Sequence, residues 1–119
     1  MNVLLLEDRG AAAFFVEQWL RQNGHNVLSA FNPNDAHSHW SKREEVPIHC
    51  IILDLNLPTD GLSDSQRERT VGGLLSGWVW LHDVALADAA EMRQRTIIYS
   101  DYIPTLRQNV PEEKYKEIT

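Results

Sequence analysis

The chain has 119 residues, 43% of them hydrophobic, which is enough to fill the core of one domain. Its formal net charge of -6 disfavours unspecific binding to nucleic acid and gives no reason to expect an anionic membrane as a partner. No apolar run is long enough to cross a bilayer, and charged residues directly after residues 3–6 argue against a signal peptide, so we expect a cytoplasmic protein. Cys50 is the single cysteine, and an intrachain disulfide is therefore excluded.

The predicted elements alternate between strand and helix. In chain order they are a strand at 3–6, a helix at 10–22, a strand at 26–30, a helix at 32–43, a strand at 49–53, a helix at 73–93, a strand at 96–99 and a helix that Pro104 opens. The strands at 3–6, 49–53 and 96–99 are short apolar runs rich in branched side chains, as is typical of parallel strands covered on both faces, and the strand at 26–30 is weaker. Because this order requires right-handed crossovers, the sequence predicts a single α/β domain over residues 1–119 with a doubly wound parallel sheet.

Two segments carry more specific predictions. In the helix at 10–22, apolar residues recur at helical spacing and predict one buried face: Ala12, Phe15, Val16, Trp19 and Leu20. Residues 59–70 are polar, charged and poor in large apolar side chains. They predict an enlarged, mobile loop at about 59–76 that has no apolar anchors.

Acidic residues follow three of the predicted strands. Glu7 and Asp8 come after the first strand, Asp54 after the third, and Ser100 with Asp101 after the fourth. The carboxyl ends of parallel strands meet at the edge where α/β sheets bind ligands, and carboxylates gathered there repel one another unless a cation lies among them. Mg²⁺ suits such oxygen ligands, and a carboxylate beside it can attack a phosphoryl group. The sequence therefore predicts a metal site with Asp54 as the nucleophile.

Three segments resemble the receiver domains of two-component response regulators, in the order and spacing of that family. They are LLLED at 4–8, IILDLNLP at 51–58 and IIYS at 97–100. The likeness covers about residues 1–110, and its most specific motif is the one at 51–58. The resemblance implies a flavodoxin-like receiver fold and a phosphorelay switch in signal transduction that is not a turnover enzyme.

The resemblance also implies a role for each matching residue. Glu7, Asp8, Asp54 and the backbone carbonyl of Asn56 would hold Mg²⁺. Asp54 would also accept a phosphoryl group from a histidine kinase or a phosphotransfer protein and become an aspartyl phosphate. Ser100 would turn its hydroxyl toward that group after transfer.

The chain also departs from the pattern of the family. Asp101 stands where the family has a small residue, and it would narrow the path to the phosphoryl group. The family places a lysine on a fifth strand, and Lys114 and Lys116 come too early for that role. We therefore expect a receiver truncated before or within its fifth strand and lacking the last helix, with an open sheet edge that would allow a homodimer. Gly77 matches a glycine that the family has near the start of the third helix.

Two other functions remain open at this point. A degenerate pseudo-receiver, which binds a protein partner without phosphorylation, is favoured by Asp101 and by the enlarged loop. A phosphohydrolase of the haloacid dehalogenase type also uses an aspartate nucleophile at a strand end, but it needs a second aspartate where this chain has Asn56.

Overall fold

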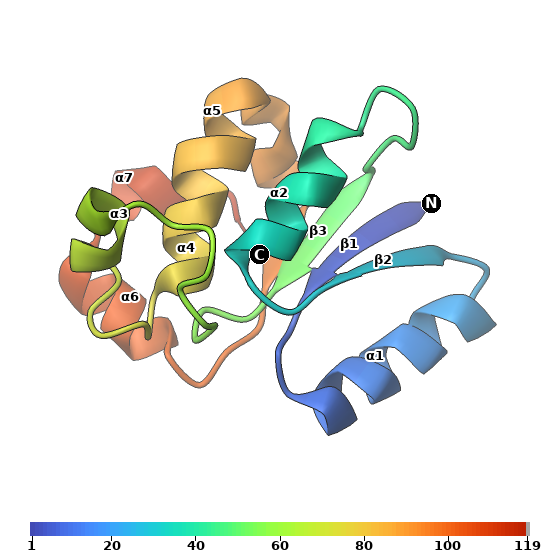
Figure 1. Ribbon diagram of the computed structural model, residues 1–119, viewed down its shortest axis with the longest axis horizontal. Coiled ribbons are helices and arrows are strands. Elements are labelled where there is room, and N and C mark those ends of the chain that lie inside the picture. The colour runs from blue at the N-terminus through green and yellow to red at the C-terminus, as the bar shows by residue number, and fades with distance from the viewer. Residues whose placement is uncertain (119) are drawn as a thin grey trace.

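The computed structural model describes residues 1–118, and at its centre lies a parallel sheet of four strands (Figure 1). The strands are β1 (Asn2–Leu6), β2 (Asn26–Ala30), β3 (Cys50–Leu53) and β4 (Thr96–Ile98), in the order β2-β1-β3-β4. The predicted α/β class with a parallel sheet is confirmed. In the described part of the chain, no helix is both long and apolar enough to cross a membrane.

The two faces of the sheet carry different helices. Helix α1 (Gly10–Gln22) covers one face, and α2 (Pro33–Ser41) and α4 (Ser76–Trp80) lie on the other (Figure 1). The alternation along β1 explains this division, since Leu4 and Leu6 belong to the large core under α2 and α4, whereas Val3 and Leu5 pack with Leu20 of α1. The strand register keeps the carboxyl ends level, because Leu6 pairs with both Ala30 and Leu53.

The predicted helix at 73–93 is interrupted in the structure. Gly72 and Gly73 have φ values of 68° and 92°, which a right-handed helix excludes, so α4 begins only at Ser76. After α4 the chain forms a π-helical turn (Leu81–Ala85, η1) and the short helix α5 (Leu86–Asp88). Ala89 then breaks the helix with φ -144°, and a 3₁₀ segment, η2 (Ala90–Arg95), leads into β4.

The chain after β4 folds back onto α4. It forms α6 (Ile103–Asn109) and α7 (Glu112–Tyr115), and Leu106 of α6 is 2% exposed. The rings of Trp78 and Tyr115 meet edge to face with their centroids 6.3 Å apart. This side of β4 is therefore covered, whereas Ile97, which lies on the α1 side of the sheet, stays 41% exposed.

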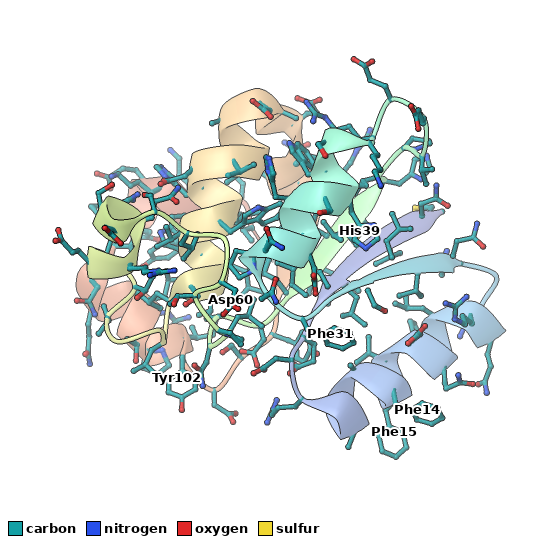
Figure 2. The ribbon with its side chains drawn as sticks, in the orientation of Figure 1. Phe14, Phe15, Phe31, His39, Asp60 and Tyr102 are labelled. Carbon is teal, nitrogen blue, oxygen red and sulfur yellow. The ribbon has the colours of Figure 1, made fainter. Side chains whose placement is uncertain are left out.

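The buried face predicted for α1 is wrong in part. Ala13 and Leu20 are buried, while Phe15 and Trp19 are 72% and 62% exposed. Phe14 and Phe15 point away from the sheet (Figure 2). The helix carries two apolar stripes, and the sheet covers the one that includes Ala13 and Leu20. Helical spacing detects both stripes but does not say which of them meets the sheet.

The stretch at 59–76 is folded to a larger extent than predicted. It contains helix α3 (Asp64–Glu68), which Ser63 and Gln66 cap reciprocally, and its leucines Leu62 and Leu75 are 6% and 1% exposed. The prediction that this stretch has no apolar anchors is therefore wrong. Two flanking leucines and a four-residue capping box are enough to hold a segment whose average composition is polar. Its mobility stays a prediction.

An ion pair between Arg69 and Asp83 also ties this stretch to η1, and we expect it to make stability depend on pH. Burial alone would raise the pKa of Asp83, but hydrogen bonds from Arg69, His82 and Gln66 outweigh it and lower the pKa to about 2. A carboxyl with a depressed pKa adds stability that is present above its ordinary pKa of 3.8 and is lost as the pH falls toward about 2. We expect Asp83→Asn to lower the free energy of unfolding at neutral pH by only on the order of 1 kcal/mol, because Arg69 is half exposed.

Urea unfolding of both proteins between neutral pH and about pH 2 would measure this effect. The wild-type protein should lose more stability below about pH 4 than Asp83→Asn does. Asp64→Asn is the matched control, because Asp64 is fully exposed and reaches Arg67 only at 3.9 Å. If the free energy of unfolding fell equally with pH in the wild-type and Asp83→Asn proteins, this ion pair would not contribute to stability.

Candidate functional site

The acidic residues predicted to meet at the carboxyl edge of the sheet do lie together. Glu7 directly follows β1, and Asp54 directly follows β3, which pairs with β1. Carboxylate oxygens of Glu7, Asp8 and Asp54 lie within 4.8 Å of one another, and residues 1–118 contain no other such group of acidic, histidine or cysteine ligands. Glu7 and Asp54 are buried and Asp8 is exposed, so the cluster extends from the protein interior to the surface.

Glu7 is held on both of its carboxylate oxygens. The Tyr99 hydroxyl donates to Oε2 at 2.8 Å, and the backbone N–H of Arg9 donates to Oε1 at 2.9 Å. Burial, together with the Glu7 carboxylate, raises the pKa of Tyr99 well above its ordinary value, so the phenol keeps the proton that it donates. These bonds compensate Glu7, which is 1% exposed, for the hydration that it loses.

Asp54 is oriented by the turn that follows it. Its Oδ1 accepts from the backbone N–H of Leu55 at 2.7 Å and from that of Asn56 at 3.4 Å. Its Oδ2 lies 3.8 Å from Nη2 of Arg9. Burial raises the pKa of Asp54, the nearby Ser100 hydroxyl lowers it and the Glu7 charge raises it, with a net upward shift. A cation bound beside Asp54 would oppose that shift.

Helix α4 presses directly on the backbone of Asp54. The Gly77 N–H donates to the Leu55 carbonyl at 2.9 Å. A Cβ atom at Gly77 would lie 2.1 Å from the carbonyl oxygen of Asp54 and 2.9 Å from Cδ1 of Leu53. Only glycine allows this approach, and the approach fixes the turn that carries the carboxylate.

A cavity of about 200 Å³ opens beside the carboxylate, and its lining consists of Asp8, Arg9, Asp54, Asn56, Asp101 and Tyr102. Asp101 thus faces the same space as Asp54. Ser100 is half buried, and its Oγ accepts from the backbone N–H of Tyr102 at 3.1 Å. The lysines of the C-terminal segment line two other cavities.

Sequence reasoning missed two residues that contact the carboxylates of the cluster, Arg9 and Tyr99. Arg9 is the cation of the cavity wall. Its position directly after Glu7 and Asp8 in the sequence could have indicated that it lies beside the acidic cluster. Tyr99 supports Glu7 from 92 residues further along the chain, and only the pairing of the strands brings the two together.

A scan against models of protein families finds none that matches this chain, and a search of curated proteins also finds no match. Neither comparison connects the chain to a protein of known activity. A functional assignment therefore rests on the residues of the chain and on the geometry of the site.

Proposed function

We propose that the chain is a phosphoacceptor receiver domain of a response regulator, with a flavodoxin-like fold. Asp54 takes a phosphoryl group from a histidine kinase or a phosphotransfer protein, and the product changes a surface that contacts other proteins. The observation that supports this proposal is the buried, oriented carboxylate of Asp54, clustered with Glu7 and Asp8 beside a small open cavity.

The donor set is compatible with Mg²⁺. It offers carboxylate oxygens from Glu7, Asp8 and Asp54. Asn56 lines the same cavity, and its backbone carbonyl would be a fourth oxygen ligand. Within residues 1–118, Arg9 is the cation that pairs with the cluster, and it neutralises only part of the negative charge there. When bound, Mg²⁺ would neutralise the oxygens of the phosphoryl group during transfer.

The residues of the chain account for the transfer step. Oδ1 of Asp54 is fixed by the two backbone N–H groups, which leaves Oδ2 as the attacking atom. A bond forms between Oδ2 and phosphorus, and the bond from phosphorus to the imidazole nitrogen of phosphohistidine breaks, with its electron pair leaving on that nitrogen. The Ser100 hydroxyl then donates to an oxygen of the aspartyl phosphate. The reaction ends at this product, so the domain is a switch and not a turnover enzyme.

A second function is favoured by one specific observation. Asp101 lines the cavity of Asp54, and its negative charge opposes an incoming phosphoryl group. A pseudo-receiver that binds a protein partner without phosphorylation is therefore the alternative. The two functions differ in whether Asp54 reacts.

Intact-mass measurement after incubation with acetyl phosphate and Mg²⁺ decides between them. The wild-type protein should gain one phosphoryl group, and Asp54→Asn should gain none. Asp60→Asn is the matched control, because it removes an exposed carboxylate six residues further along the chain and should react as the wild type does. A wild-type protein that gains no mass while it binds Mg²⁺ would overturn the proposal in favour of the pseudo-receiver.

A further inference from the structure

A cation of the chain itself lies on the acidic cluster. Nε of Arg9 is 3.4 Å from Oε1 of Glu7, and its Nη2 is 3.8 Å from Oδ2 of Asp54. The guanidinium thus bridges two of the three carboxylates that would hold a metal ion. It also forms part of the wall of the 200 Å³ cavity.

We propose that Arg9 is the resident counter-cation of this cluster and that it competes with a divalent ion for Asp54. Binding of the ion and departure of the guanidinium from Asp54 are then one coupled event. This inference rests on the proposed function, because it concerns the same metal site.

The charges explain why the two cations exclude each other. The three carboxylates carry three negative charges, and one guanidinium neutralises one of them. A divalent ion among the carboxylates neutralises more charge, but it repels a guanidinium a few ångströms away. A monovalent ion that displaced Arg9 would replace one unit charge by another, so Arg9 also disfavours monovalent ions at this site.

The contacts of Arg9 allow the exchange. Its side chain is 60% exposed, and the 3.8 Å contact to Asp54 is longer than a hydrogen bond, so little attraction is lost when Nη2 moves away. Nε of Arg9 also donates to Oε1 of Glu7 at 3.4 Å. The shorter hydrogen bonds from the backbone N–H of Arg9 and from the Tyr99 hydroxyl hold both oxygens of Glu7 without it. The cluster therefore keeps its geometry while Arg9 swings toward solvent.

Calorimetric titration with MgCl₂ at constant ionic strength tests the inference without a phosphoryl donor. Arg9→Gln should bind Mg²⁺ about threefold to tenfold more tightly than the wild type. Arg21→Gln is the matched control, because it removes the same charge near the other end of α1, about 18 Å away along the helix. Its affinity should stay within about twofold of the wild-type value, since charges at that separation are screened by salt.

The possible results have different meanings. Equal or weaker binding by Arg9→Gln would overturn the inference, and the proposed function would stand. An equal gain in both variants would overturn it as well, because net charge and not the position of the guanidinium would then set the affinity. If none of the proteins bound Mg²⁺, the cluster would not be a metal site. That result would overturn both this inference and the proposed Mg²⁺-dependent transfer. Because Arg9 is mostly exposed, all three proteins should fold, which far-ultraviolet circular dichroism would verify.

Discussion

Gly77→Ala should lower the free energy of unfolding by about 3 kcal/mol, the largest effect that we expect from a single methyl group in this protein. The added Cβ would lie 2.1 Å from the carbonyl oxygen of Asp54. That oxygen belongs to the backbone and cannot rotate away as a side chain would, so α4 has to move off the end of β3. Urea unfolding followed by tryptophan fluorescence would measure the loss.

Gly10→Ala is the control for this substitution. No atom lies within 4 Å of a Cβ at Gly10, and the residue begins α1, where alanine favours the helix. The stability of Gly10→Ala should equal or exceed that of the wild type. If the two alanine variants were equally stable, the close approach of α4 to Asp54 would be wrong. Because the clash falls on Asp54, which we propose as the phosphoacceptor, Gly77→Ala should also slow the reaction with acetyl phosphate.

Leu20→Ala should lower the free energy of unfolding by about 2 to 5 kcal/mol, whereas Trp19→Ala should lower it by less than about 1 kcal/mol. Leu20 is 4% exposed and packs with Val3, Leu5 and Val27 of the sheet, so its truncation leaves a cavity. Trp19 is the larger side chain but is 62% exposed. Denaturant midpoints of the two variants would give the comparison.

A large loss of stability in Trp19→Ala would contradict the exposure of Phe15 and Trp19 to solvent. In that event the stability of the wild-type protein should be measured at several concentrations, because a second copy covering α1 would make the midpoint depend on concentration. A midpoint that does not change would instead mean that α1 is rotated on the sheet and that the stripe with Phe15 is the buried one.

The sequence by itself determined the frame of this protein and the core of its site. Short apolar runs identified most of the strands, since strand preference is a local property of the backbone. The meeting of Glu7 with Asp54 was predictable too. In a parallel sheet every strand ends at the same edge, so residues that follow two adjacent strands must be neighbours.

Tertiary structure alone decided which groups surround that core. The bond from Tyr99 to Glu7 spans 92 residues and depends on the register between β1, β3 and β4. The exposure of Trp19 and the contact of Arg9 with Asp54 are also set by tertiary packing. Each depends on how whole elements pack, because local spacing identifies an apolar stripe or a charge but not the surface that will lie against it.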